Sequence, residues 1–221
     1  EDGEILVSGK NTHLGYYKNE DATRECYTDD GYLRTGDAGY FGEDGHLYVF
    51  DRAKDIMTVD DGTRFAPQDI ETRLKFSAYI NEAMVCGDKR PFVTAIVSID
   101  LENVGNWAKK RGISYTTFQD LSQRSEVYRL VQEEISQINQ RFPINIRIKR
   151  FAILLKQLHP DDGELTRTRK VRRKVVGGRY QALIKDMYQS LKVHDLDLEI
   201  NYEDGRKSVL KGTIAIEEIP S

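Results

Sequence analysis

The spacing of apolar residues in this 221-residue chain changes at Pro67, and that change constrains the fold more than any other feature. Before Pro67 the apolar residues alternate in short segments, which are separated by Asp-Gly pairs. This pattern is typical of strands joined by tight hairpin turns. After Pro67, longer segments place apolar residues three and four positions apart, which is the spacing of an amphipathic helix. The sequence therefore predicts a β-rich front piece followed by a mixed domain.

The region after Pro67 alternates predicted helices with predicted strands. A helix begins at Pro67, because proline favours the first helical position, and another ends at Gly112, because glycine readily takes the left-handed conformation that caps a helix. Residues 125–142 predict a third helix with one apolar face, and residues 171–191 predict a fourth that Gly177-Gly178 interrupts. Strands are predicted within residues 81–88, 92–100 and 148–155.

The end of the chain predicts a β-hairpin, because strand patterns flank the turn sequence Glu-Asp-Gly-Arg-Lys at residues 203–207. Residues 51–67 predict a shorter two-stranded ribbon. The fold class expected from these patterns is α+β. The chain starts within a strand pattern, at Ile5 to Val7, and without an initiator Met, so we expect it to be a piece of a longer chain.

Charge is distributed unevenly along the chain. Residues 167–174 read RTRKVRRK and hold six basic residues in eight, yet the formal net charge of the whole chain is −3. Such a run in isolation indicates a nucleic-acid patch or a solvated face. A nucleic-acid partner is not expected here, since the chain is not basic and no aromatic residues are interleaved with these charges.

Composition excludes several other classes of protein. Cys26 and Cys86 have no metal-binding or redox spacing, so they are predicted to be reduced packing residues. The four histidines lack metal-ligand spacing, and no metal site built from protein ligands is expected. No apolar run reaches the roughly 18 residues of a membrane span, and no signal-peptide pattern is visible. These features predict a cytoplasmic location and leave peripheral membrane association open.

Three segments carry a resemblance to a known family. They are GEILVSGKNTHLGYYKNEDAT at residues 3–23, DGYLRTGDAGYFGEDGHLYVFDRAKDIM at residues 30–57 and DGELTRTRKVRR at residues 162–173. In this order they resemble the later motifs of the acyl-adenylate-forming superfamily, which includes acyl-CoA synthetases, peptide-synthetase adenylation domains and luciferases. The resemblance runs from residue 3 to about residue 188. Within the superfamily, the chain is most similar to long-chain fatty-acid–CoA ligases.

The resemblance implies three parts. Residues 1–51 would be the C-terminal β-rich edge of a large N-terminal adenylation domain. Residues 52–190 would be a small, mobile, mixed α/β C-terminal domain carrying the catalytic lysine, and residues 191–221 a β-hairpin extension. That hairpin could extend the sheet of the small domain or form a homodimer contact.

The resemblance also implies a two-step reaction. A fatty acid and ATP, with Mg²⁺ on the phosphates, give an acyl-adenylate and pyrophosphate. The thiol of CoA then takes the acyl group, and AMP leaves. The expected partners are therefore fatty acid, ATP, CoA and the missing N-terminal domain of the same chain.

The nucleotide contacts implied by the resemblance fall on Asp37, in the Thr-Gly-Asp motif, and on Arg52. The Asp37 carboxylate can accept hydrogen bonds from both ribose hydroxyls of ATP or AMP. The Arg52 guanidinium would approach the same ribose or the α-phosphate as a permanently charged donor. The residues themselves leave two alternatives open: a turn carboxylate at Asp37, and a surface ion pair of Arg52 with Asp51 or Asp55.

The resemblance places the hinge between the two domains at Lys54, where backbone rotation matters more than the side chain. It assigns the loop at residues 58–65 to the second half-reaction, with Gly62 near the pantetheine arm of CoA. The family usually has Gly-Gly or Ser-Gly there, whereas this chain has Asp61-Gly62. A simple type I′ hairpin turn is an alternative interpretation of the same residues.

Within the basic run, Lys170 and Arg173 match the family's catalytic lysine and the arginine that follows it. The lysine would contact the fatty-acid carboxylate and the α-phosphate of ATP, because a cation between two anions offsets their repulsion in the transition state. The superfamily generally has Ser-Gly before this lysine, whereas Thr168-Arg169 here fits the long-chain branch. Lys174 is the weaker choice, since no arginine follows it at that spacing. The flanking cations could be solvated or could attract the CoA phosphates.

Two other functions stay open at this stage. The chain lacks the phosphate loop, adenine pocket and acyl tunnel that the family carries earlier, so it is expected to have no ligase activity alone. It could then be a catalytically silent module that binds nucleotide weakly or docks to its missing half. An aryl- or medium-chain-acid CoA ligase is the other alternative, because the acyl pocket lies outside the chain.

Overall fold

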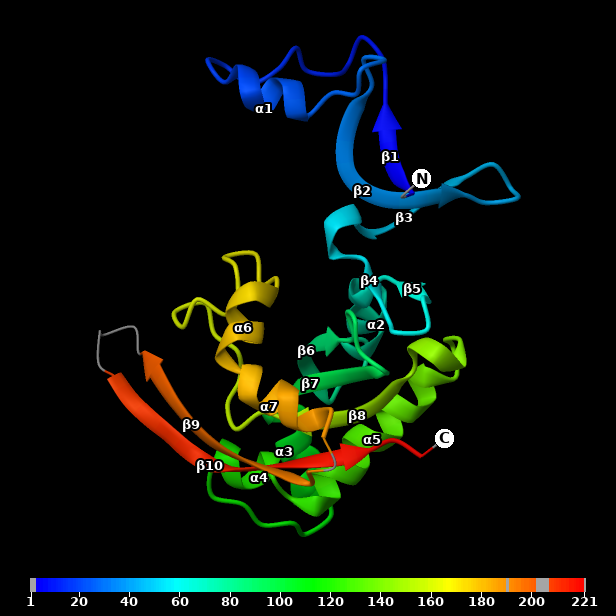
Figure 1. The fold of residues 1–221 in the computed structure, drawn as a ribbon. Helices are drawn as coiled ribbons and strands as arrows, with labels where there is room; N and C mark the ends of the chain where they lie inside the picture. The colour runs from blue at the N-terminus through cyan, green and yellow to red at the C-terminus, as the bar shows by residue number, and fades with distance from the viewer. Residues whose placement is uncertain (1–2, 190, 202–206, 221) are drawn as a thin grey trace. The chain divides into compact units, whose positions relative to one another are not determined.

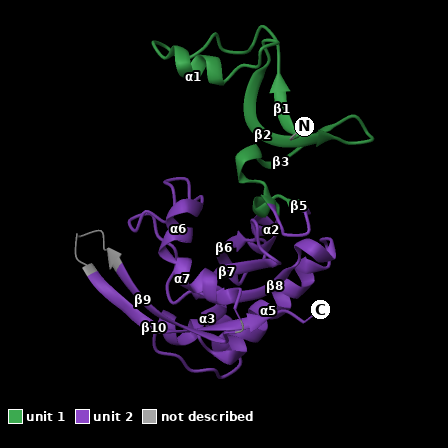
Figure 2. Ribbon diagram, viewed as in Figure 1, with its two compact units in different colours: residues 1–57, 64–69 green, residues 58–63, 70–221 purple. Residues whose placement is uncertain are grey.

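The computed structural model describes residues 3–189, 191–201 and 207–220. The chain divides into two compact units (Figure 2). The first unit comprises residues 1–57 and 64–69, and the second unit comprises residues 58–63 and 70–221.

The first unit is built on a small antiparallel sheet with the strand order β1-β2-β3 (Figure 1). Helix α1 precedes β2, and the side chain of Asn19 caps its start by accepting a hydrogen bond from the Ala22 N–H at 3.1 Å. The strands predicted before Pro67 are confirmed, whereas α1 was not predicted. The element bounds are β1 (Glu4–Val7), α1 (Glu20–Glu25), β2 (Leu33–Phe41), β3 (Leu47–Arg52) and the 3₁₀ helix η1 (Ala53–Asp55).

The predicted ribbon and the helix at Pro67 are both present. Strands β4 (Met57–Thr58) and β5 (Arg64–Phe65) form a two-stranded sheet. Helix α2 (Pro67–Leu74) then begins at the proline itself. Proline lacks a backbone N–H, and the first turn of a helix does not need one.

The second unit is organised around a five-stranded mixed sheet with the order β6-β7-β8-β10-β9 (Figure 1). Strands β7 and β8 are parallel, and the other neighbouring pairs are antiparallel. The parallel pair requires a long crossover, and α3, α4 and α5 supply it. The strands are β6 (Ile80–Cys86), β7 (Val93–Ile99), β8 (Ile148–Ile153), β9 (Val193–Asn201) and β10 (Lys207–Glu218).

Most of the predicted helices are confirmed, including the stop at Gly112. The Gly112 φ is +70°, and the Ile113 N–H returns to the Ala108 carbonyl at 3.0 Å. The helices of the second unit are α3 (Leu101–Lys110), α4 (Phe118–Ser122), α5 (Ser125–Asn139), the 3₁₀ helix η2 (Ile144–Ile146), α6 (Arg173–Arg179) and α7 (Gln181–Met187).

The helix predicted over residues 171–191 is wrong in two respects. The break lies at Tyr180, between α6 and α7, and Gly177-Gly178 lie inside α6. Val171 precedes the helix and forms a β-bridge with Leu165. Tyr180 is only 1% exposed, so the break coincides with a large buried side chain and not with the two glycines, although glycine is a poor helix former.

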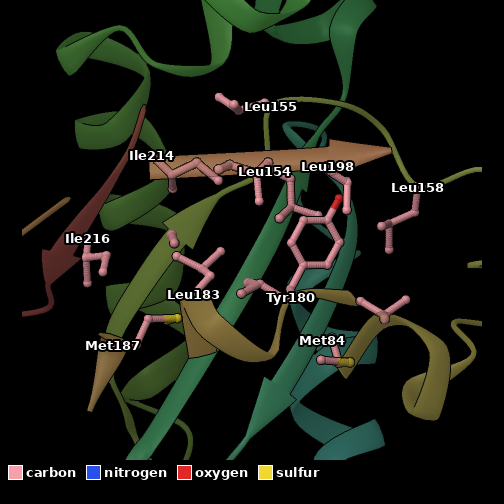
Figure 3. Close-up of a cluster of buried hydrophobic side chains, with 14 of the residues drawn as sticks. Met84, Leu154, Leu155, Leu158, Tyr180, Leu183, Met187, Leu198, Ile214 and Ile216 are labelled. Atoms are coloured by element: carbon pink, nitrogen blue, oxygen red, sulfur yellow. The ribbon is translucent and has the colours of Figure 1, made fainter. Parts of the chain in front are cut away.

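Both faces of the large sheet are covered by helices. One face packs against α6 and α7, and Figure 3 shows the resulting core around Tyr180, Leu183 and Met187. On the other face, the ring of Tyr128 from α5 lies 5.6 Å from the ring of Phe151 in β8. Burial on both faces explains the nearly continuous apolar sequence of β7, whose residues are all buried.

The tail extends the sheet of the second unit, which was one of its two predicted roles. β10 pairs with β8, and β9 then forms the edge. Side chains of α4 and α5 bind the β10 backbone: Gln119 donates to the Lys211 carbonyl at 2.9 Å, and Tyr128 donates to the Ala215 carbonyl at 2.9 Å. Most of the predicted turn at residues 203–207 lies outside the described residues, and the homodimer contact stays a prediction.

The α+β fold class is confirmed, with a β-rich front piece, a mixed α/β body and a β-hairpin tail. Cys26 and Cys86 are both free, as predicted. Burial raises the pKa of the Cys86 thiol to about 12, so this residue packs and stays protonated at neutral pH. Within the described residues, no helix is long and apolar enough to cross a membrane.

Candidate functional site

The structure brings Asp37 and Arg52 together. They lie opposite each other on β2 and β3, and the Arg52 Nη1 is 3.0 Å from the Asp37 Oδ1. The Arg52 side chain is 57% exposed and the Asp37 side chain 39% exposed, so a ligand could reach both groups. The ion pair considered from the sequence does exist, but its acidic partner is Asp37, and Asp51 instead accepts the backbone N–H of Arg52 at 2.7 Å.

The part of β2 just before Asp37 is held in place from β1. Gly36 has a φ of +71°, and its N–H donates to the Glu4 carboxylate at 3.0 Å. The Thr35 hydroxyl donates to the Ile5 carbonyl at 2.7 Å and accepts from the Asp37 N–H at 3.1 Å. Asp37 and Arg52 therefore form an exposed carboxylate–guanidinium pair on a fixed backbone, which is suited to bind hydroxyl and phosphate groups.

Lys54 lies in η1, with an exposed side chain. Met57 is the last residue of the first stretch of the first unit, and the chain enters the second unit at Thr58. The residue predicted as the hinge is thus close to a boundary between compact units.

Gly62 lies in a hairpin loop of the second unit, at residues 59–63. The Val59 N–H donates to the Thr63 carbonyl at 3.0 Å, and the Gly62 N–H donates to the Val59 carbonyl at 2.9 Å. Gly62 has a φ of +87°, and no atom lies within 4 Å of where a Cβ would be. A type I′ turn is excluded, since it requires positive φ at both central residues and Asp60 and Asp61 are not among the positive-φ residues.

This Gly62 loop rests on the β6–β7 turn. The Lys89 N–H donates to the Thr58 carbonyl at 2.7 Å, and the Asp60 N–H donates to the Arg90 carbonyl at 2.9 Å. The Asp88 carboxylate also accepts the Thr58 N–H at 3.1 Å. The loop therefore has a fixed base and an open tip at Gly62.

Lys170 lies in a second hairpin loop, at residues 166–170. The Thr166 N–H donates to the Lys170 carbonyl at 2.8 Å, and the Arg169 N–H donates to the Thr166 carbonyl at 2.9 Å. The Lys170 N–H donates in turn to the Thr166 hydroxyl at 3.0 Å. The Lys170 side chain is exposed, and no carboxylate pairs with it in the part of the chain that the structure describes.

Arg169 has a φ of +57°, a left-handed conformation that glycine adopts more easily. The residue that stands where the superfamily generally has glycine thus adopts a backbone conformation that glycine would take without strain.

Arg173, which the sequence coupled to Lys170, is engaged elsewhere. Its guanidinium donates to the Glu71 carboxylate and to the Val85 carbonyl, both at 2.7 Å. Lys174 is exposed on α6. Arg173 thus fixes the start of α6 against α2 and β6, and within the described residues Lys170 has no carboxylate partner.

Sequence reasoning missed a buried cluster of charges just before the Lys170 loop. Glu164 is fully buried and pairs with Lys156 and with Arg179, whose Nη1 lies 2.9 Å from the Glu164 carboxylate. Asp162 joins them, at 2.9 Å from the Lys156 Nζ. The acidic residues lie directly before the basic run, but their partners Lys156 and Arg179 lie outside that run, so local sequence gave no signal for this pairing.

The class of protein follows from a match with a protein-family model. Residues 54–192 match the AMP-binding enzyme C-terminal domain, which is well over half of the chain. The chain belongs to this family of AMP-binding enzymes.

The similar curated proteins are fatty-acid–CoA ligases. The chain is 35% identical over 189 residues to the long-chain-fatty-acid–CoA ligase FadD15 of Mycobacterium tuberculosis, covering 85% of this chain and 31% of that protein. It is 30% identical over 195 residues to human long-chain-fatty-acid–CoA ligase 1, covering 87% of this chain and 28% of that protein. The chain thus spans about a third of the length of these relatives.

Solved structures share the fold at lower identity. The adenylation domain of a carboxylic acid reductase from Segniliparus rugosus, solved with AMP and a co-purified carboxylic acid, has a TM-score of 0.69 at 20% identity. The match covers 84% of this chain and 28% of that one. The fold of adenylate-forming enzymes is therefore confirmed.

Proposed function

We propose that this chain is the C-terminal part of a long-chain fatty-acid–CoA ligase. The whole protein would convert a fatty acid and ATP to acyl-AMP and pyrophosphate, and would then transfer the acyl group to CoA with release of AMP. The names of the relatives support the acid class. The observation that carries the proposal is Lys170: an exposed ammonium, without a carboxylate partner among the described residues, on a hydrogen-bonded hairpin.

In the first step, a carboxylate oxygen of the fatty acid attacks the α-phosphorus of ATP, and the bond to pyrophosphate breaks. Two anions approach each other, so their repulsion contributes to the barrier. The Lys170 ammonium would lie between them and stabilise the charge on the transferring phosphoryl group. A paired lysine would do this poorly, and among the described residues no carboxylate pairs with Lys170, whereas Arg173 and Arg179 have the partners Glu71 and Glu164.

Asp37 and Arg52 would hold the nucleotide. The Asp37 carboxylate would accept hydrogen bonds from both ribose hydroxyls, and the Arg52 guanidinium would bind the ribose or the α-phosphate. Their ion pair keeps the two groups oriented before the ligand arrives. Binding of a ribose would then only require the exposed Asp37 oxygens to exchange water for hydroxyls.

The second step places different demands on the same carbonyl. The CoA thiol attacks the acyl-adenylate and AMP leaves, so Lys170 is no longer needed there. We propose that a rotation near Lys54 withdraws Lys170 and brings in the Gly62 loop. The open tip of that loop supports this role, because a backbone without a side chain lets the pantetheine arm pass closely.

Mg²⁺ would enter with the phosphates of ATP. No cluster of three or more His, Cys, Asp or Glu side chains among the described residues could hold a metal ion. The ion would neutralise phosphate charge when bound, and the roles assigned here to Lys170, Asp37 and Arg52 are those of the chain's own side chains.

Residues 1–51 would be the edge of the larger adenylation domain, and residues 52–190 the mobile domain. The first unit exposes aromatic side chains on its sheet, including Tyr40 and Phe41 at 58% and 75%. Such apolar surface is typical of a face that contacts other protein. A silent docking module remains the second candidate for the chain alone, and the acid class of the whole protein could be aryl or medium-chain.

The test uses the full-length protein that contains this chain. Lys170→Ala is expected to lower fatty-acid-dependent ATP–pyrophosphate exchange by roughly 100-fold or more, the effect typical of losing one transition-state contact. Transfer to CoA from supplied acyl-adenylate should change little. Lys174→Ala, an exposed lysine four residues away, is the matched control and should leave both half-reactions unchanged.

The opposite results would be informative. Unchanged exchange in Lys170→Ala would contradict the proposed role of Lys170. Absence of fatty-acid-dependent exchange in the wild-type protein would contradict the proposed reaction itself. Exchange with an aryl acid but not a long-chain acid would replace the acid class and keep the mechanism.

A further inference from the structure

We infer that Glu164 is a positioning residue for Lys170. Glu164 is the residue at which the Lys170 hairpin joins the body of the second unit. Its carbonyl accepts the Arg172 N–H at 2.8 Å, and Leu165 and Val171 form the next bridge. The role assigned to Lys170 in this inference rests on the proposed function, whereas the fixing of the hairpin does not.

The side chain of Glu164 lies in a buried cluster of charges. One carboxylate oxygen accepts from the Arg179 guanidinium at 2.9 Å. The other accepts from the Lys156 ammonium and from the His159 N–H, the latter at 3.2 Å. Lys156 lies just after β8, and Arg179 ends α6. One side chain thus ties the base of the hairpin to two separate elements.

The cluster is balanced in charge. Two carboxylates, Asp162 and Glu164, face two cations, Lys156 and Arg179, and the carboxylates are only 5% and 0% exposed. A buried ion pair stabilises a fold little more than apolar residues of the same size would. A buried ion pair does fix the relative positions of the segments that carry it, because each charge must meet its partner at hydrogen-bond distance. The cluster is therefore suited to fix where the hairpin begins.

The same pairing keeps nearby carboxylates from pairing with the Lys170 ammonium. Asp162 and Glu164 are the acidic residues nearest in sequence to the basic run. Both are occupied inside the cluster, and the described cations Arg167, Arg169 and Lys170 have no carboxylate partner. Glu164 would act through the backbone. It would fix the position of the hairpin without placing a carboxylate beside the Lys170 ammonium.

The first measurement is amide hydrogen exchange in this chain. Glu164→Gln keeps the size of the side chain and removes its charge. The hairpin amides of Thr166, Arg169, Lys170 and Arg172 are expected to exchange at least about ten-fold faster in this variant. The matched control is Glu82→Gln in β6, which removes another buried carboxylate, paired with Lys75 at 2.8 Å, outside the hairpin.

The second measurement compares the half-reactions of the full-length protein. In Glu164→Gln, pyrophosphate exchange should fall roughly 10- to 100-fold, because a misplacement of about 1 Å costs that much. The loss should appear in kcat more than in KM for ATP. Transfer from supplied acyl-adenylate should match Glu82→Gln. A merely structural role would lower both half-reactions together.

The outcomes separate the two proposals. Equal amide exchange in Glu164→Gln and Glu82→Gln would overturn the inference, whatever the activity. Faster hairpin exchange without any wild-type ligase activity would keep the positioning role and reject the proposed function. If Glu164→Gln does not fold, the double variant Glu164→Gln, Lys156→Gln leaves Asp162 and Arg179 balanced and provides the same comparison.

Discussion

The loops at residues 59–63 and 166–170 close in the same way and carry opposite charge. In each, the first N–H donates to the fifth carbonyl, and the fourth N–H donates to the first carbonyl. In each, the fourth residue has positive φ, but it is Gly62 in one loop and Arg169 in the other. The first loop carries Asp60 and Asp61, whereas the second carries Arg167, Arg169 and Lys170.

Two further loops show that this hairpin geometry is common in the chain. Residues 28–32 and 42–46 have the same two backbone hydrogen bonds, with Gly31 and Gly45 at the left-handed position. Glycine therefore fills that position in three of these four loops. Arg169 costs roughly 1–2 kcal/mol of left-handed strain that glycine avoids, and it shares positive φ with two other described cations, Lys18 and Lys89.

The loops also differ in how they satisfy the N–H of the fifth residue. In residues 59–63 and 42–46 the third residue is Asp, and Asp61 accepts the Thr63 N–H at 2.8 Å. In residues 166–170 and 28–32 the first residue is Thr, and Thr166 accepts the Lys170 N–H at 3.0 Å. A threonine hydroxyl does this without adding a negative charge beside Lys170.

The largest stability effect is expected at Gly62. Gly62→Ala puts a Cβ on a residue with φ +87°, and nothing lies close enough to clash, so strain alone decides the result. The free energy of unfolding should fall by about 1–2 kcal/mol. Urea unfolding of this chain measures the change, and Gly178→Ala in α6, where no atom approaches the new Cβ and φ is not positive, is the matched control.

That control should be neutral or slightly stabilising, since alanine favours a helix over glycine by about 1 kcal/mol. Equal losses in the two variants would mean that the left-handed conformation is not what the Gly62 loop requires. The comparison with Arg169 would then lose its physical basis.

A smaller effect of opposite sign is expected at Arg169. Arg169→Gly removes roughly 1–2 kcal/mol of strain and adds about 0.5–1 kcal/mol of conformational entropy lost on folding. The net change is a stabilisation of about 0.5 kcal/mol, visible as a higher midpoint in urea. Arg167→Gly, in the same loop, is the control and should destabilise, because Arg167 has no positive φ to relieve.

Local patterns predicted those parts of the molecule that local chemistry decides. Pro67 began a helix and Gly112 ended one. The position of Gly62 in a hairpin was also predictable, because an Asp-Gly pair between strands favours a turn. The type I′ turn considered from the sequence was wrong, because two-residue and three-residue hairpin loops share the Asp-Gly signal.

Long-range packing decided what the sequence could not show. Tyr180, at the break between α6 and α7, belongs to a buried cluster that includes Leu198 and Ile214 from the tail strands (Figure 3). The insertion of β10 beside β8 depends on side chains of α4 and α5 that bind its backbone. The burial of Glu164 depends on Lys156, from the segment after β8, and on Arg179, from the end of α6.

The smallest stability effect is expected from lowering the pH. Of the two loops at residues 59–63 and 166–170, the acidic loop should respond and the basic loop should not. The hydroxyl and the N–H of Thr63 donate to Asp61 and lower the pKa of its carboxyl. A carboxyl whose pKa is lower in the folded state stabilises the fold above its unfolded pKa of about 4, and this contribution is lost as pH falls through the folded value. Asp61 is fully exposed, so the loss should be small.

Asp61→Asn tests this difference between the loops. Above about pH 5 the variant should unfold at slightly lower urea than the wild type, and the gap should close as the pH falls below about 4. Thr168→Ala, at the equivalent position of the basic loop, removes a hydroxyl 3.0 Å from the Thr166 hydroxyl, and its effect should not vary with pH. A gap that persists at pH 3 for Asp61→Asn would show that Asp61 acts by its shape. The two loops would then differ in charge without differing in their response to acid.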